Sequence, residues 1–300
     1  MNSTYEFTKS SALVDYMTPF RQSQDQYSWD HGSLSTVKGT SRATEQIFSF
    51  SGLPAAAQTK ELQSIFYADM GEQAATTFTV NKYTLATMFS HEFLKDSWHL
   101  PDMLKEAGSA AGESHAFIVD QAMAAPFNRA FNSSYTMYDD VELCGDHTMD
   151  SGDSYSNELT AASLTYDNLW LAVNFFETTP ISHSGLYLTD KPAGVLYHPS
   201  KEKEVQAIRQ SQLKPGTADN DKNTLGDYNL DYISCRHLST TTNWFVYGSK
   251  FKRDFLRLTR EPVNTATDDD FDRMGMKFRS YQRFAVGIRD FIWIVGNQGA

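Results

Sequence analysis

Hydrophobic and polar residues alternate along the last part of the chain, from residue 277 to residue 296. One set of alternate positions is apolar and comprises Phe278, Phe284, Val286, Ile288, Ile292 and Ile294. The other set carries four cations and then two aromatic residues, namely Lys277, Arg279, Arg283, Arg289, Phe291 and Trp293. Successive side chains of a β-strand point to opposite faces, so this pattern predicts a strand with one apolar and one partly cationic face.

Helical periodicity replaces alternation over residues 94–125. Apolar and small side chains recur there at helical spacing, at Met103, Leu104, Ala107, Ala110, Ala111, Ser114, Phe117 and Ile118. This stripe predicts a long helix that begins near Pro101 and ends or kinks at Pro126. Gly108 and Gly112 each weaken such a helix by about 1 kcal/mol relative to alanine. Small residues also let another backbone approach the helix closely.

Further elements follow from local signals. A second helix is expected after Thr165, whose side chain suits the N-cap position. Its apolar face would consist of Leu169, Ala172, Val173 and Phe176. Strand-type segments lie at residues 46–50, 64–68, 76–80, 84–89, 194–198, 232–237, 244–247 and 254–258. These helices and strands do not alternate as they do in doubly wound enzymes, so the pattern predicts an α+β fold.

The remaining segments are polar. A turn or tip is expected between residues 69 and 75, a short helix over residues 200–210, and loops over residues 139–162 and 211–228. Residues 1–44 hold only a weakly amphipathic patch and are expected to form an arm with little core of its own.

Composition and charge limit the classes of function. The 300 residues are 40% hydrophobic and 13% aromatic, which is typical of a folded chain. The net charge is −11, but residues 251–300 hold 9 Lys+Arg against 7 Asp+Glu, whereas the first 250 residues hold 17 against 30. An acidic body repels phosphates, so non-specific nucleic-acid binding is not favoured. Any meeting with DNA is expected to be local, or a matter of enclosure.

Cysteine usage and hydropathy indicate where the chain is made. Two cysteines are too few for a disulfide framework, which favours a reducing compartment. The first residues lack the basic and apolar regions of a secretory signal, and no apolar run reaches the length of a membrane span. The sequence predicts synthesis in the cytoplasm and no membrane partner.

The candidate chemistry is sparse. Cys144 and His147 form one pair of possible zinc ligands, and Cys235 and His237 form another, so a metal-dependent hydrolase is one alternative. The favoured interpretation is buried thiols beside hydrogen-bonding histidines. Phosphate-binding glycine loops, nucleophile elbows and dinucleotide fingerprints are absent from the sequence. We therefore expect no catalytic residue, no resident metal and no cofactor.

Several segments, taken in order, resemble the major capsid protein of tailed bacteriophages, which has the Hong Kong 97-like fold. They are YADMGEQAATTFTVNKYTLATMFSHEFLKDSW (67–98), APFNRAFN (125–132), LCGDHTMDSG (143–152), LYHPSKEKEVQAI (196–208) and YQRFAVGIRDFIWIVG (281–296). The resemblance implies an N-terminal arm (1–44), an extended loop with flanking strands (45–93), a spine helix with part of the peripheral domain (94–137), an axial domain (138–250) and a return to the peripheral domain (251–300).

The resemblance also implies a function and partners. It implies a protein that self-assembles through hexamers and pentamers into an icosahedral shell enclosing double-stranded DNA, with no catalytic site. Portal, scaffold or decoration proteins would be further partners, and the virion, assembled in the bacterial cytoplasm, would be the location. An encapsulin-like compartment, which shares the fold but packages an enzyme, is the alternative.

The same resemblance suggests subunit-interface residues. Arg279 and Arg283, with Lys277 and Arg289, would meet acidic surface on a neighbouring chain or on the N-terminal arm, and Tyr67 and Met70 of the extended loop would contact a neighbour. An intramolecular role, in which the long cationic side chains lie over the spine helix, is the alternative for the four cations.

Overall fold

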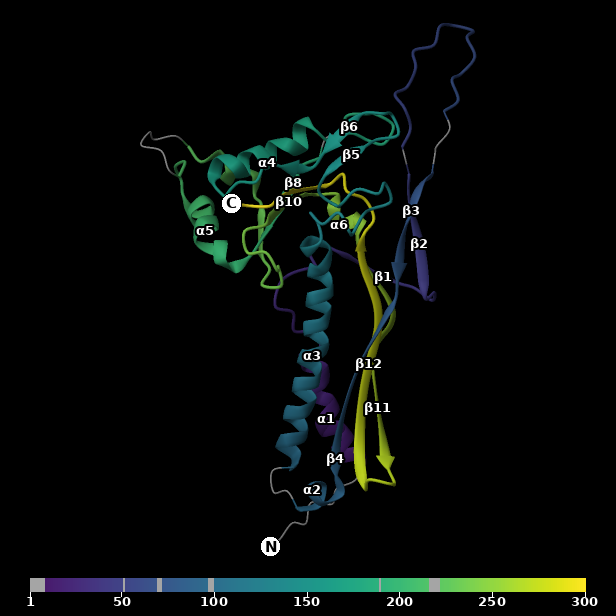
Figure 1. The fold of residues 1–300 in the computed structure, drawn as a ribbon, viewed down its shortest axis with the longest axis vertical. Helices are drawn as coiled ribbons and strands as arrows, with labels where there is room; N and C mark the ends of the chain where they lie inside the picture. The colour runs from purple at the N-terminus through teal and green to yellow at the C-terminus, as the bar shows by residue number, and fades with distance from the viewer. Residues whose placement is uncertain (1–8, 51, 69–71, 97–99, 189, 216–221) are drawn as a thin grey trace.

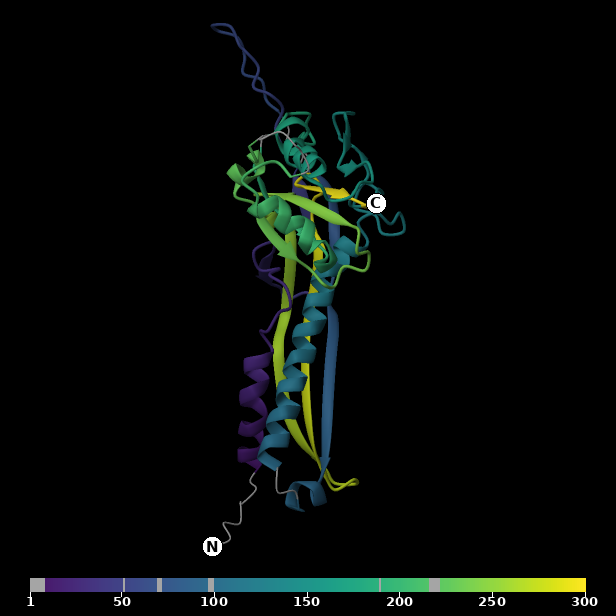
Figure 2. The same ribbon diagram turned by 90° about the vertical axis from the view of Figure 1, so that its left-hand side faces the viewer.

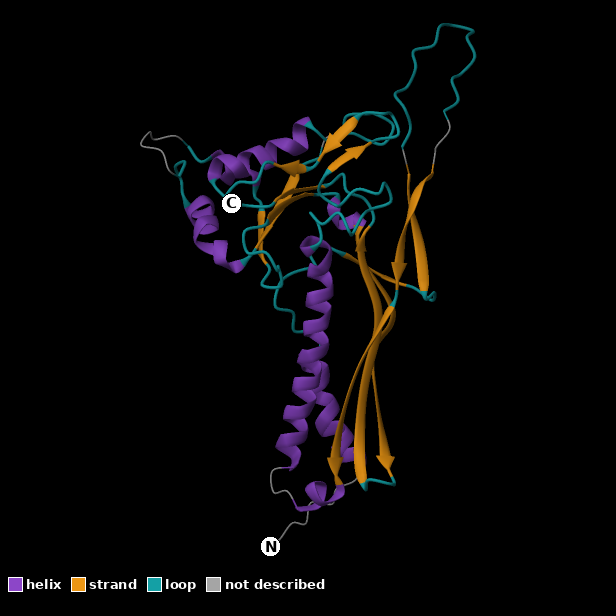
Figure 3. Cartoon of the chain, in the orientation of Figure 1, coloured by secondary structure: helices purple, strands orange, loops and turns teal. Residues whose placement is uncertain are grey.

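A long helix and a narrow sheet run side by side along the length of the molecule, with a globular part at one end (Figure 1). The computed structural model describes residues 9–50, 52–68, 72–96, 100–188, 190–215 and 222–300. Helices and strands are both abundant and the sheets are mixed, so the α+β class is confirmed (Figure 3). Within the described residues, no helix combines the length and apolar character that a membrane span requires.

The narrow sheet has the strand order β1-β11-β12-β4. Its members are β1 (Thr36–Gly39), β11 (Phe255–Asp270), β12 (Gly275–Ile288) and β4 (Asn81–Ser90). β12 is antiparallel to both β11 and β4, whereas β1 is parallel to β11. The expected alternation holds from residue 277 to residue 284, where even positions are buried and odd positions are exposed or half-buried.

The long helix α3 (Leu100–Asn128) covers one face of this sheet, and the short helix α2 (His91–Asp96) precedes it. Pro126 lies within α3, two residues before its end, so this proline is tolerated in the last turn. Helix α1 (Lys9–Ser23) packs against α3, as the turned view shows (Figure 2). A Cβ atom at Gly108 would overlap the carbonyl oxygen of Tyr16, and one at Gly112 would overlap that of Phe20. The expected close approach of another backbone is confirmed.

The N-terminal segment packs onto the core of the body. Tyr16 and Phe20 of α1 are buried against α3 and β12, and Trp29 and Leu34 join the main core. These side chains are buried against other parts of the chain, so the described part of the segment packs onto the body and forms no separate core. The apolar residues that fix it are few and widely spaced, so its own periodicity is weak.

The globular end is built on a second sheet of order β7-β13-β10-β8-β9. Its strands are β7 (Glu158–Leu159), β13 (Ile294–Asn297), β10 (Trp244–Gly248), β8 (Pro192–Tyr197) and β9 (Asp231–Ser234). The helical elements of this end are α4 (Tyr166–Thr178), η1 (Pro199–Lys201), α5 (Glu202–Gln210), η2 (Thr224–Tyr228) and α6 (Phe251–Asp254). Thr165 caps α4 as expected, because its side chain accepts a hydrogen bond from the Asn168 amide. The strand pair β5 (Asp146–Thr148) and β6 (Ser154–Ser156) interrupts the loop expected over residues 139–162.

A two-stranded hairpin projects beyond the body (Figure 1). It consists of β2 (Thr44–Phe50) and β3 (Glu72–Thr79), which are antiparallel. Residues 64–68 do not form the expected strand, since they lie in the exposed loop and pair with no other residue that the structure describes. The turn expected over residues 69–75 is wrong from Glu72 onward, where β3 has already begun.

The closing strand is also shorter than its alternation predicts. β12 ends at Ile288, and the chain turns before β13 enters the other sheet. Phe291, Ile292 and Trp293 lie in this turn and are all buried. Odd and even positions are both apolar there because the whole turn is buried, and not because a strand has two apolar faces. The single strand predicted over residues 277–296 is therefore two strands in two sheets.

Candidate functional site

Two of the cations on β12 form ion pairs with acids of the neighbouring strand β11. Lys277 pairs with Asp270, and the Arg283 guanidinium lies 3.0 Å from a carboxylate oxygen of Glu261. These partners are placed by the antiparallel register of β11 and β12. Both cations therefore form ion pairs within the chain.

Arg279 differs from its two neighbours on the strand. It is exposed, and its guanidinium lies 5.9 Å from the ring centroid of Tyr281. Lys82 of β4 approaches the same ring at 5.8 Å. Among the described residues, no carboxylate lies within ion-pair distance of Arg279. It is the cation of the row best placed to meet an acidic partner.

Arg289 follows the last residue of β12 and forms an ion pair with a buried carboxylate. Its guanidinium pairs with Asp254, whose side chain is fully buried, and its amide donates to the Asp254 carbonyl at 2.8 Å. Burial raises the pKa of Asp254 and the positive charge of Arg289 only partly opposes this. A buried carboxylate of this kind depends on its cation, because desolvation is otherwise uncompensated.

Replacing Arg289 with methionine is expected to lower the free energy of unfolding at neutral pH by about 3 kcal/mol, because Asp254 would lose its main cation. The deficit should shrink on acidification. A carboxyl whose folded pKa is raised supports folding in its protonated form, and that support is lost as the pH rises through the folded pKa. Urea unfolding from neutral to mildly acidic pH measures this. The exposed variant Arg279→Met is the control, and an equal loss in both variants would contradict the assignment.

The loop between the hairpin strands exposes several large apolar side chains. Those of residues 53–67 are Leu53, Leu62, Ile65, Phe66 and Tyr67. Tyr67 is 86% exposed, while Met70 lies outside the described residues. The loop is hydrogen-bonded to the body at Leu53, whose carbonyl accepts from the Ser184 hydroxyl at 3.1 Å. An apolar loop this exposed is typical of a segment that contacts another molecule.

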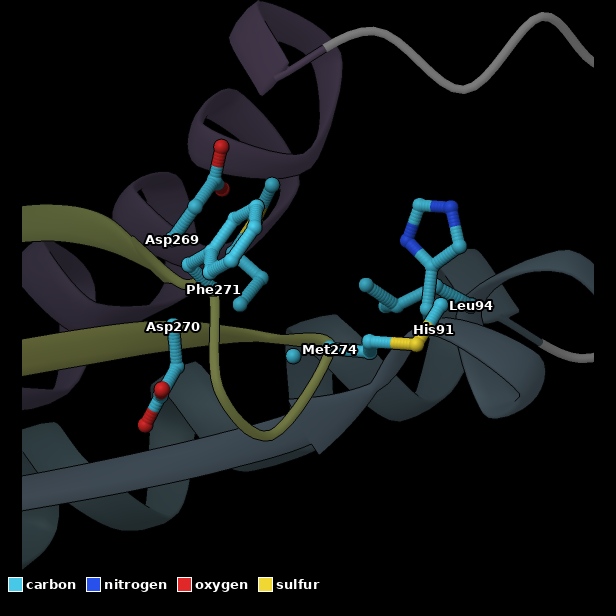
Figure 4. A pocket seen from close by; sticks show the side chains of 8 residues that line it. His91, Leu94, Asp269, Asp270, Phe271 and Met274 are labelled. Atoms are coloured by element: carbon cyan, nitrogen blue, oxygen red, sulfur yellow. The ribbon is translucent and has the colours of Figure 1, made fainter.

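The turn from β11 to β12 and helix α2 lie at the end of the molecule opposite the hairpin loop (Figure 1), and their side chains line a pocket there (Figure 4). A pocket of about 550 Å³ is lined by Phe271 and Met274, on the turn from β11 to β12, and by His91 and Leu94 of α2. Phe271 is 94% exposed. Asp269 and Asp270 add an acidic margin to the pocket. Both ends of the elongated chain therefore present apolar surface.

The side chains of the cysteine and histidine pairs are buried or in contact with other groups of the chain. Cys144 and Cys235 are fully buried, and burial raises the pKa of both thiols, that of Cys235 to about 12. His147 stacks on Phe291 at 3.6 Å and bonds Asp139 at 2.6 Å. In the described part of the chain, no three Cys, His, Asp or Glu residues are grouped as metal ligands. The His237 ring lies 3.0 Å from the Ser28 hydroxyl and packs edge-on against Phe117. Buried protonated thiols and engaged imidazoles do not favour the hydrolase alternative.

One polar group at the base of the hairpin was not foreseen from the sequence. Asp290 is buried, and its carboxylate contacts Ser49, His183 and Tyr138, which come from three distant segments. An acid inside an apolar stretch, as in Arg-Asp-Phe-Ile-Trp, is a signal that could have indicated a buried role. Its partners cannot be inferred from sequence spacing.

Solved structures of similar fold are found, whereas a scan against protein-family models and a search of the curated proteins find no match. The capsid structure of cyanophage P-SCSP1u is 10% identical, with a TM-score of 0.62 over 92% of this chain and 89% of that chain. The mature capsid of bacteriophage PhiM1 is 14% identical, with a TM-score of 0.60 over 92% and 88%. A virus-like particle from Pyrococcus furiosus is 8% identical, with a TM-score of 0.58 over 94% and 97%. The Hong Kong 97-like fold expected from the resemblance is confirmed.

Proposed function

We propose that this chain is a major capsid protein, whose copies assemble through hexamers and pentamers into an icosahedral shell that encloses double-stranded phage DNA. The observation that carries the proposal is the fold, which the chain shares over about nine-tenths of its length with phage capsid proteins. In this proposal the protein is structural and has no enzymatic role. Portal, scaffold or decoration proteins are its further partners, and the virion is its location.

The shape and surface of the chain support this proposal. Exposed apolar residues at opposite ends of an elongated molecule suit head-to-tail contacts, in which one end of a copy meets a different surface of the next. Rings close when the rotation between copies allows it. The hairpin loop with Tyr67 and Met70 would be one contact element. Residues 138–250 would form the axial domain, and residues 94–137 with 251–300 the peripheral domain.

Of the four cations, only Arg279 is assigned direct contact with a neighbouring chain in this proposal. Arg279 is the cation we expect to meet a neighbouring chain, since it is exposed and its recorded contact is with a ring. Lys277, Arg283 and Arg289 would act indirectly, by holding the strand and its end in place through ion pairs within the chain. The acidic remainder of the chain supplies partners for Arg279 and favours enclosure of DNA over binding to it.

Electron microscopy of the purified full-length chain, with size-exclusion chromatography and light scattering, tests the proposal. We expect closed shells of uniform diameter, or regular rings of five and six copies. A chain that stays monomeric or dimeric, both alone and when expressed together with its neighbouring genes, would contradict it. Shell contents decide between the two shell functions: double-stranded DNA supports a phage head, and an enclosed enzyme supports an encapsulin-like compartment.

A further inference from the structure

The base of the β2–β3 hairpin is tied to the turn that follows β12. The Ser49 hydroxyl of β2 donates to a carboxylate oxygen of Asp290 at 2.7 Å. The Thr76 hydroxyl of β3 donates to the Arg289 carbonyl at 3.1 Å. Each strand of the hairpin thus makes one side-chain hydrogen bond to one of two consecutive residues, which fixes both strands relative to the same point of the body.

Asp290 is in turn held by the globular end. The imidazole Nε2 of His183 lies 3.3 Å from the carboxylate. The Tyr138 hydroxyl lies 3.0 Å from the same nitrogen and 3.4 Å from the other carboxylate oxygen. Asp290, His183 and Ser49 are each 5% exposed or less. The carboxylate of Asp290, in the turn that follows β12, is therefore a shared acceptor for the hairpin and the globular end.

The charge of Asp290 is maintained despite its burial. Burial alone would raise the pKa of this carboxyl, but the hydrogen bonds from His183 and Ser49, with the charge of His183, outweigh it and leave the pKa lowered. Hydrogen bonds to an ionised acceptor are about twice as strong as those between neutral groups. The tie to Ser49 is therefore one of the stronger polar contacts available to the hairpin.

Small movements at the base of the hairpin become larger movements at the tip of its loop. An isolated two-stranded hairpin is marginally stable at best, and the loop that begins at residue 52 extends beyond it. Because strands rise about 3.3 Å per residue, the tip of the loop lies far from the base of the hairpin. A rotation of the hairpin by a few degrees at its base would therefore displace this tip by several ångströms. Phe78, which is buried near Gly287, is the apolar part of the same anchor.

We propose that Asp290 is the positioning residue of the hairpin: it fixes the direction in which the exposed apolar loop leaves the body, by accepting from Ser49 while the globular end holds its carboxylate. The consequence for shell geometry rests on the proposed function. The positioning itself is a property of the single chain and can be measured without assembly.

The test compares Ser49→Ala and Asp290→Asn with Thr77→Ala, in the full-length chain below its assembly concentration. Thr77 is exposed on the same hairpin, so its variant removes a hydroxyl without touching Asp290. Losing a hydrogen bond to a charged acceptor should raise amide hydrogen exchange in β2 and β3 about tenfold or more. Exchange in α4 and the urea midpoint of the whole chain separate this effect from general destabilisation. Electron microscopy then scores the uniformity of shells.

Faster exchange confined to β2 and β3 in Ser49→Ala and Asp290→Asn, with Thr77→Ala like the parent, supports the positioning role. Equal exchange in all variants, or an increase spread over α4 as well, overturns it. Shells of mixed diameter from Ser49→Ala support the consequence for assembly, and uniform shells overturn that consequence. If the parent chain forms no shell, the proposed function fails, while the exchange result still decides whether Asp290 positions the hairpin.

Discussion

Replacing Ile65, Phe66 and Tyr67 together with serine is expected to abolish shell formation while leaving the folded chain intact. These side chains are 71%, 58% and 86% exposed, so the isolated chain gains little stability from them. Burying each against a neighbour would contribute about 1.5–3 kcal/mol. Removing three such contacts should raise the protein concentration needed for assembly roughly 1,000-fold or more, since 1.4 kcal/mol corresponds to a tenfold change. Light scattering during assembly measures this concentration.

The control is a triple variant of the same loop that spares its large apolar residues. Ala55→Ser, Gln58→Ser and Thr59→Ser change exposed positions of low hydrophobicity, so assembly should match that of the parent. Circular dichroism and the urea midpoint should be the same for all three proteins. Normal shells from the apolar variant would show that the loop is not a contact element. An equal loss in the control would point to the backbone of the loop instead of its apolar side chains.

Elements whose determinants are local could be predicted from the sequence. Helix α4 is one, because the N-cap of Thr165 and the apolar face from Leu169 to Phe176 lie within one short segment. The inner part of β12 is another, since its alternation reflects one buried face. The close approach of another backbone at Gly108 and Gly112 could also be predicted, because small residues leave space for it.

Features that depend on pairing between distant segments could not be predicted. β11 runs to Asp270 although its second half is polar, because thirteen of its residues find partners on β12. Residues 64–68 have strand-type composition but no partner, and stay in the loop. The same limit applies to the site. Alternation places Lys277 and Arg283 on one face, but Asp270 and Glu261 become their partners only through the register of the β11–β12 pair.

Replacing both Gly108 and Gly112 with alanine is expected to destabilise the chain, although the same change on a free helix would stabilise it by about 1 kcal/mol per site. Both added methyl groups would overlap carbonyl oxygens of α1. Helix α1 would have to move outward, which separates Tyr16 from Phe278, now stacked at 4.6 Å, and breaks the bond between Ser23 and Ser109. Losing the burial of Tyr16 and Phe20 should cost about 3–5 kcal/mol.

The sign of the effect is what distinguishes close packing from helix propensity. Ala110 is exposed on the same helix, so Ala110→Gly should cost about 1 kcal/mol through propensity alone. Glycine to alanine at residues 108 and 112 and alanine to glycine at residue 110 are therefore both expected to destabilise the chain. Helix propensity alone predicts opposite signs for these two changes. Urea unfolding gives the two free energies, and tryptic cleavage after Arg21 reports whether α1 has left α3. A double alanine variant more stable than the parent would mean that α1 does not depend on these glycines. Slow cleavage after Arg21 in a destabilised variant would mean that the strain is absorbed within α3 instead.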